Sequence, residues 1–270
     1  MRHVPREPDA SVNVSDEHPL SEAATLTVGL SLIFIVIAAL LVFMVDAAVY
    51  LLPAEREAEL FESWLPEDIE TVSDDERLAT VVAITDRLAA RYPESPYTFR
   101  VQIDASPTSN AMAFPGGLII VTAGLLDDVE TENELAFVLA HEIGHFHNRD
   151  HLRSMGRGLV LSLLLVSLGV GDSANFGASI ANLTLRSFSR EQETDADEFA
   201  LRLVYEEYGH VADADRFFER ILAEHGDTTA LVEYASTHPS SAERIDHLAE
   251  LAAENGWPTT GTLTTVEWRR

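Results

Sequence analysis

The sequence contains no cysteine and no lysine. Without cysteine, the chain has no disulfides, thiol nucleophiles, iron–sulfur clusters or thiolate-bound zinc, although this absence assigns no cellular compartment. The 18 basic residues are therefore all arginines, and 45 acidic residues outnumber them, which gives a formal net charge of −27. A protein this acidic has little from which to build the basic face that a phosphate backbone requires. We therefore expect no nucleic-acid partner.

Charged residues are also missing from a long stretch near the N-terminus. No charge lies between Glu22 and Asp46, and residues 23–45 would form a helix about 34 Å long. Because the hydrocarbon core of a bilayer is about 30 Å thick, we expect a transmembrane anchor in the lipid bilayer there, preceded by an acidic leader at residues 1–22. A cleaved signal peptide is the alternative, which the length of the run and the acidic leader disfavour.

The arginines around this anchor predict a membrane orientation. Arg2 and Arg6 precede the apolar run, and Arg56 follows it. Cytoplasmic flanks carry an excess of positive charge, so this distribution favours a single-pass protein with a cytoplasmic N-terminus. The residues after the anchor are then expected outside the cytoplasm.

Hydrophobic periodicity after the anchor predicts a mainly α-helical α+β domain over residues 53–255, followed by a C-terminal tail at residues 256–270. Alternating and β-branched patterns predict a small sheet with strands at residues 97–103 and 117–122. The apolar segment 158–171 is short for a span, so we expect a buried or membrane-resting helix, with a second span as the alternative. Further helices are expected at residues 53–65, 74–91, 187–208 and 213–225, from Glu132 onward, and after a cap formed by Ser240 and Glu243.

The helix predicted from Glu132 carries an H-E-x-x-H motif from His141 to His145. Histidines at positions i and i+4 project from the same helix face, so their imidazoles can bind one metal ion. Glu142 lies next to the first histidine and can reach the open coordination position, where it would take a proton from water as general base. The motif predicts one Zn²⁺ per chain, and two ordinary surface histidines are the alternative.

A second histidine pair, His147 and His151, has the same i, i+4 spacing. Asn148 follows the first of them, so this pair lacks a carboxylate base, and we expect a structural or solvent-facing role. His151 also falls where metzincins place a third zinc-binding histidine, with Asn148 at the position of their glycine. Metzincins require a methionine turn further downstream, and the last methionine here is Met155, so we disfavour that alternative.

A catalytic zinc ion takes three protein ligands and one water, so a third ligand must come from another element. In the segment SREQETDADEFA, the residues Arg190, Glu193 and Asp197 share one helix face. We assign Glu193 as the third ligand and Asp197 as an acceptor that orients a ligand histidine. Glu191 is the competing ligand, and a solvated acidic surface is the alternative interpretation for all of these acids.

Four sequence blocks, covering roughly residues 75–252, together resemble a known family of membrane-associated zinc metallopeptidases. This family includes the CAAX prenyl protease, the heat-shock protease HtpX and the mitochondrial stress protease Oma. The blocks that carry the resemblance are NAMAFPGGLIIVTAGLL (110–126), LAHEIGHFHNRDHLR (139–153), SFSREQETDADEFAL (187–201) and STHPSSAERI (236–245). The resemblance implies a helical, zincin-like gluzincin peptidase domain with zinc on His141, His145 and Glu193, and with Glu142 as general base.

The resemblance also implies roles for residues outside the zinc helix. His238 would lie beside the site and steady the oxyanion, although a plain loop position before Pro239 is an equal alternative. Arg244 would pair with acids of the site. An edge strand would bind an extended substrate as an additional strand, through Asn110, Ala111, Met112 and Ala113. Other members of the family have several membrane spans where this chain has one clear span, so prenylated substrates are not implied.

These inferences predict a membrane-anchored zinc metalloendopeptidase that cleaves protein or peptide substrates, in membrane or envelope protein quality control. One alternative is a membrane-tethered chaperone-like or binding factor with a latent or structural zinc site. A fourth protein ligand, such as His238 or Asp197, would favour that alternative, because structural zinc sites are closed. A zinc hydrolase that acts on bonds other than peptide bonds is a third possibility.

Overall fold

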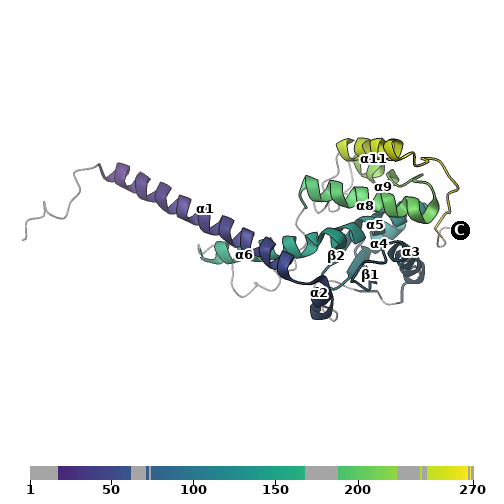
Figure 1. The fold of residues 1–270 in the computed structure, drawn as a ribbon, viewed down its shortest axis with the longest axis horizontal. Coiled ribbons are helices and arrows are strands. Elements are labelled where there is room, and N and C mark those ends of the chain that lie inside the picture. The colour runs from purple at the N-terminus through teal and green to yellow at the C-terminus, as the bar shows by residue number, and fades with distance from the viewer. Residues whose placement is uncertain are drawn as a thin grey trace, which may run out of the picture.

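The computed structural model describes residues 18–61, 71–72, 74–167, 188–223, 238, 242–266 and 268. A long helix leads away from a domain in which further helices pack around a small sheet, as Figure 1 shows, so the α+β class is confirmed. The elements in chain order are α1 (Pro19–Leu51), α2 (Ala54–Phe61), α3 (Leu78–Ala90), β1 (Arg100–Asp104), β2 (Ala111–Phe114), β3 (Leu118–Thr122), α4 (Ala123–Asp128), α5 (Glu132–Asn148), α6 (Asp150–Ser167), α8 (Arg190–Tyr208), α9 (Arg216–Ala223) and α11 (Ala242–Asn255).

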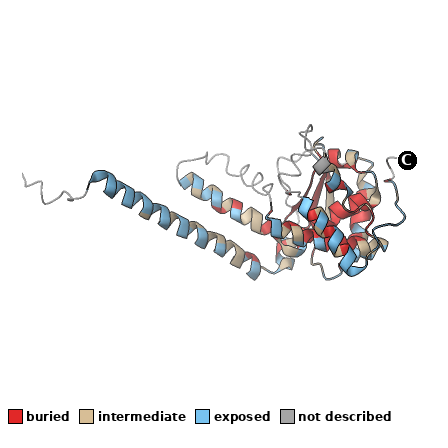
Figure 2. Ribbon diagram, turned by 90° about the horizontal axis from the view of Figure 1, so that it is seen from above, coloured by how far each residue is buried: buried red, intermediate tan, exposed pale blue. Residues whose placement is uncertain are grey.

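Helix α1 contains the apolar run of residues 23–45. It begins after the N-cap His18 with proline in its first turn, where a missing backbone N–H has no consequence. Its 33 residues make it long and apolar enough to cross a membrane, by length and composition. Along most of its length α1 is exposed, whereas the interior of the domain is buried (Figure 2).

The sheet has the strand order β1-β3-β2, with β1 parallel and β2 antiparallel to β3. β1 begins three residues later than predicted, because its partner strand β3 begins only at Leu118, which pairs with Arg100. Gly116 and Gly117 form the β2–β3 turn with positive φ angles of 82° and 79°. A side chain at Gly116 would come within 2.5 Å of the Phe61 carbonyl oxygen, so the turn requires glycine.

Helix α5 begins at Glu132 as predicted. Thr131 caps it by accepting a hydrogen bond from the backbone N–H of Glu134. The helix is buried from Asn133 to Phe146 between the sheet, α3 and α8. Gly144 permits its closest approach to α8, because a Cβ there would lie 3.0 Å from the Cα atom of Ala196.

The other predicted helices are present with adjusted ends. α8 begins at Arg190, because Ser189 forms a capping box with Gln192 immediately before it. Some predicted positions lie outside the described residues: leader residues 1–17, helix residues 62–65, 168–171, 187 and 224–225, Ser240, and tail residues 267, 269 and 270. The segment predicted as a C-terminal tail contacts the domain: Thr264 accepts a hydrogen bond from the backbone N–H of Glu132, and the Trp268 indole donates to the Leu126 carbonyl.

A buried ionic cluster joins the segment after α1 to the end of α5. Glu57 of α2 is fully buried and accepts a hydrogen bond of 2.6 Å from the Tyr97 hydroxyl. Its other oxygen lies 2.5 Å from Nε2 of His151, and the Arg149 guanidinium approaches to 3.0 Å. A buried carboxylate is stable only when its charge is compensated, and here a cation and two hydrogen-bonding groups compensate it.

Arg149 also binds the last turn of α1. Its Nη1 atom donates to the backbone carbonyls of Val49 and Leu52, at 2.7 and 2.6 Å. The last carbonyls of a helix have no partner within the helix and carry partial negative charge, so a guanidinium is a favourable cap. Arg149 thereby attaches the end of the helix predicted to be a membrane anchor to the domain.

Replacing Glu57 with alanine is expected to lower the free energy of unfolding by about 3–5 kcal/mol, because Arg149 and His151 would remain buried without an anion. Burial raises the pKa of Glu57, but His151, Tyr97 and Arg149 outweigh burial and lower the pKa below its ordinary value of 4.5. The stabilisation is therefore complete above pH 4.5 and is lost as the pH falls through the lowered pKa. Urea unfolding of the full chain in detergent, followed by tryptophan fluorescence, measures it.

The matched control is Glu59→Ala, which removes an exposed acid from the same helix. We expect little change there, since exposed ion pairs contribute between about 0 and 1 kcal/mol. Equal losses in the two variants, or a Glu57 effect that persists in strong acid, would contradict the prediction.

Candidate metal centre

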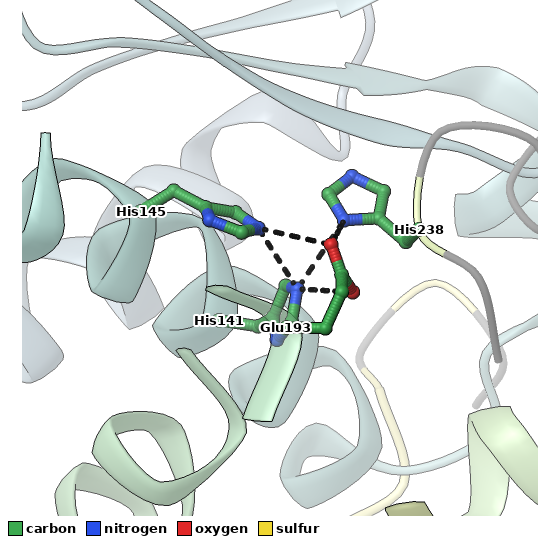
Figure 3. A group of neighbouring side chains, drawn as sticks. All are labelled: His141, His145, Glu193 and His238. Atoms are coloured by element: carbon green, nitrogen blue, oxygen red, sulfur yellow. Dashed lines mark hydrogen bonds and ion pairs between the residues drawn. The ribbon is translucent and has the colours of Figure 1, made fainter. Parts of the chain in front are cut away.

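Three side chains from two helices converge in the interior of the domain (Figure 3). His141 and His145 come from α5, and their Nε2 atoms lie 3.1 Å apart. Glu193 comes from α8, with its carboxylate oxygens 3.5 Å from Nε2 of His141 and 3.7 Å from Nε2 of His145. All three residues are fully buried. The structure therefore brings together the three ligands predicted from the sequence.

The donor atoms fit a zinc ion. Tetrahedral zinc binds imidazole nitrogen and carboxylate oxygen at about 2.0–2.2 Å, which places neighbouring ligand atoms about 3.3–3.6 Å apart. The three observed separations, from 3.1 to 3.7 Å, surround this range. The nitrogen and oxygen donor set is also one that zinc accepts.

A carboxylate lies against the far ring nitrogen of each histidine. Asp197 Oδ1 lies 2.9 Å from Nδ1 of His141, and Asp150 Oδ2 lies 3.1 Å from Nδ1 of His145. Each carboxylate fixes the orientation of its ring and leaves Nε2 directed toward the cluster. Burial lowers the pKa of His141, but Asp197 and Glu193 outweigh burial and raise the pKa to about 9.

Arg244 of α11 contacts the two buried acids of α8, Glu193 and Asp197. Its Nε atom lies 2.7 Å from Asp197 Oδ2, and its Nη1 atom lies 2.7 Å from Glu193 Oε2. Burial raises the pKa of Glu193, but the charge of His238 and the contact with His141 outweigh burial and hold the pKa well below its ordinary value. Burial also raises the pKa of Asp197, and Arg244 with His141 reverses that effect. Both acids are therefore ionised.

Glu142 and His238 lie together beside the three ligands. Glu142 is fully buried, and neither of its carboxylate oxygens has a hydrogen-bond partner among the described residues. Nε2 of His238 lies 3.6 Å from Glu142 Oε1. Nδ1 of His238 lies 3.2 Å from Glu193 Oε1 and 3.3 Å from Nε2 of His141. His238 thus contributes a fourth donor atom to the cluster (Figure 3).

Comparison with known proteins identifies the family. Residues 74–252, about two thirds of the chain, match the model of Peptidase family M48.

The chain belongs to peptidase family M48.

Named relatives of this M48 chain are metalloproteases. It is 29% identical over 203 residues to the mitochondrial metalloendopeptidase OMA1 of Schizosaccharomyces pombe, which covers 70% of this chain and 60% of that protein. With OMA1 of Arabidopsis thaliana the identity is 32% over 157 residues, covering 57% of this chain and 31% of that protein. With metalloprotease LoiP of Escherichia coli it is 25% over 230 residues, covering 74% and 87%. The chain thus spans between 31% and 60% of the length of these two OMA1 proteins.

Several residues considered from the sequence lie outside the metal cluster of this M48 chain. Glu191, the competing ligand, is exposed at the start of α8. His151 belongs to the Glu57 cluster, and exposed His147 contacts the Tyr92 hydroxyl at 2.8 Å, so neither joins the zinc ligands as a metzincin would require. The predicted substrate-binding residues Ala111, Met112 and Ala113 are buried in β2, at the edge of the described sheet, and Asn110 precedes them.

Asp150 is a site residue that the sequence analysis missed. It follows His145 by five residues, and two residues at this spacing do not face each other on one helix. Arg149 adopts the left-handed conformation, with φ of 59°, and ends α5. The reversal turns the Asp150 carboxylate back toward His145, and Gln192 of α8 fixes it with a hydrogen bond of 2.6 Å. The contact depends on the positive φ of Arg149. Residues other than glycine rarely adopt this conformation, so no sequence pattern predicts it.

Replacing Asp150 with alanine is expected to weaken zinc binding by 10- to 100-fold, the usual effect of removing a carboxylate that orients a ligand histidine. Glu193→Ala is expected to lose zinc altogether, because it removes a ligand. Competition titrations with a chromophoric chelator, performed on the purified full chain, measure both affinities.

Asp195→Ala provides the matched control, since Asp195 is an exposed acid on α8 outside the cluster. We expect it to bind zinc as tightly as the wild type. Unchanged affinity in Asp150→Ala would refute its orienting role, and full zinc retention in Glu193→Ala would remove that residue from the ligand set.

Proposed function

We propose that this protein is a membrane-anchored zinc metalloendopeptidase. The observation that supports it best is the position of Glu142, a buried carboxylate without a hydrogen-bond partner among the described residues, beside three convergent zinc ligands. A buried polar group that is left unpaired destabilises a fold by about 1–3 kcal/mol, and more when it is charged. Such a group is typical of a catalytic site, where water and substrate supply its partners.

The chain's own residues suffice for peptide hydrolysis once the metal is present. Zinc held by His141, His145 and Glu193 would polarise the scissile carbonyl and acidify water. Glu142 takes the proton of the attacking water and passes it to the leaving amine nitrogen. His238, with Nε2 directed toward Glu142, is placed to donate a hydrogen bond to the oxyanion.

The substrate is proposed to bind as an extended segment along β2. β2 lies at the edge of the described sheet, next to β3, and an edge strand is where an extended segment can bind as an additional strand. It contains Ala111, Met112 and Ala113, which the resemblance to the family predicts as substrate-binding residues. This mode of binding selects unfolded or extended protein segments, because a folded substrate cannot present a free strand.

Helix α1 is proposed to anchor the peptidase in a lipid bilayer, with the domain outside the cytoplasm. The support is its uncharged run of 23 residues, which matches the thickness of a hydrocarbon core. An anchored peptidase that takes extended segments is suited to quality control of membrane or envelope proteins. The relatives named OMA1, LoiP and "putative beta-barrel assembly-enhancing protease" are consistent with proteolysis as the activity.

Glu142→Gln is expected to retain zinc and to reduce cleavage of an unfolded casein substrate by at least about 100-fold, the lower end of what general base catalysis contributes. The amide has nearly the same shape but cannot accept the proton. Cleavage is followed by gel electrophoresis, and zinc is measured in the same preparation. Glu191→Gln, the same chemical change on an exposed residue, is the control and should cleave normally. Equal activity in wild type and Glu142→Gln would refute the assigned base.

The position of His238 favours a second candidate function. Its Nδ1 atom lies within 3.3 Å of ligand atoms from both helices, as a fourth zinc ligand would. Four protein ligands make a closed site, which is typical of structural zinc. The protein would then be a membrane-tethered binding or chaperone-like factor with a latent or structural zinc site. Against this interpretation, a structural site gives no reason to bury the Glu142 carboxylate without a hydrogen-bond partner among the described residues.

His238→Ala separates the two candidates. For the peptidase we expect three protein ligands and one water on zinc in both wild type and variant, with activity falling about 100- to 1,000-fold, as when one oxyanion donor is removed. X-ray absorption of the zinc-loaded protein counts its nitrogen and oxygen neighbours. The structural site would be favoured instead if the wild type is inactive, if its zinc binds three imidazoles, and if the zinc of the variant binds only two.

A further inference from the structure

The second half of α6 is mostly apolar and exposes leucines on opposite sides. Residues 158–167 carry no charge, and Leu161, Leu163 and Leu165 are 40%, 51% and 39% exposed. Leu161 and Leu165 share one face of the helix, whereas Leu163 lies about 160° away from each of them, at 100° per residue. A docking site for a single protein partner would expose one face. Apolar exposure on opposite faces indicates an apolar medium around the helix.

Helices α1 and α6 run side by side (Figures 1 and 2). Gly156 permits their close approach, because a Cβ at this position would meet the Val45 side chain at 2.5 Å. The next residues of the two helices, Arg157 and Asp46, form an ion pair of 2.9 Å. The two helices are therefore attached to each other at a defined level.

The ion pair lies where both apolar runs begin. Asp46 is the first charge after the uncharged run 23–45 of α1, and Arg157 is the last charge before the uncharged run of α6. From this level both runs lead away from the domain in the same direction, as Figure 1 shows. A membrane boundary at Asp46, which α1 requires, therefore also places residues 158–167 below the same boundary.

We propose that residues 158–167 of α6 insert into the hydrocarbon core of the bilayer, packed against α1. Ten residues of helix extend about 15 Å, which is half of a core about 30 Å thick. Arg157 would lie at the headgroup level, where its long side chain can keep its charge in the polar region. This inference rests on the proposed anchoring by α1 and adds a second membrane element, continuous with the zinc helix.

The absence of cysteine makes the proposal directly testable. Single cysteines at Leu161, Leu163 and Leu165 are spin-labelled in the full chain, which is then reconstituted into phosphatidylcholine vesicles. Collision rates with oxygen, which concentrates in lipid, and with a water-soluble nickel chelate are measured for each label. Leu40→Cys on exposed α1 is the lipid reference, and Ala249→Cys on exposed α11 is the water reference. Circular dichroism and zinc content verify that each labelled protein is folded.

We expect all three α6 labels to match the Leu40 reference, with high oxygen and low nickel collision rates. Nickel collision rates at the level of the Ala249 reference, with a lipid-exposed Leu40 label, would overturn the insertion of α6 while leaving the anchor intact. Low collision rates with both reagents would show that protein, such as a second copy of this chain, covers the helix. That result would also overturn the insertion of α6. A water-exposed Leu40 label would refute the anchor itself, and the insertion with it.

Discussion

The close packing of α5 on α8 is the constraint on which the metal centre depends. His141 and His145 lie on one helix and Glu193, the proposed third ligand, lies on the other, so their convergence requires the backbones to approach closely. Gly144 and Ala196 make this approach possible, since even the smallest side chain in place of Gly144 would lie 3.0 Å from the Ala196 Cα atom. Gly144 lies inside the H-E-x-x-H motif, and Ala196 lies between Glu193 and Asp197 in α8. The ligand positions and the contact that brings them together are thus encoded in the same two short segments.

The buried charges of this centre explain why it would bind a divalent cation. Four buried carboxylates surround His141 and His145, and Arg244 is the buried arginine, among the described residues, that contacts two of these carboxylates. Burying charge of one sign is unfavourable unless it is compensated, and a doubly charged ion compensates it better than a second arginine, because it coordinates several groups at once. Without the ion, the raised pKa of His141 offsets part of this excess by retaining a proton. The carboxylates concerned are Glu142, Asp150, Glu193 and Asp197.

The parts of the structure that follow from helical periodicity could be predicted from the sequence, and the parts that follow from chain reversals could not. His141 and His145 are one turn apart, and Glu193 and Asp197 are also one turn apart, so each pair could be assigned to a face before the fold was known. Their mutual position followed from the resemblance to a family, because no local rule relates two helices. Asp150 was missed, since its contact with His145 depends on the left-handed conformation at Arg149, a residue type that rarely adopts it.

The same reversal attaches α1, the proposed membrane anchor, to the metallopeptidase domain. Three consecutive residues act in three directions: Arg149 caps the last turn of α1, Asp150 orients His145, and His151 binds the buried Glu57. A flexible linker would allow the domain to reorient relative to the bilayer. Here the end of α1 is held by charged and backbone groups that are themselves fixed by the zinc helix, so any tilt of α1 must be transmitted to α5 or must break the buried cluster. The orientation of the candidate metal centre relative to α1 is therefore a property of the fold.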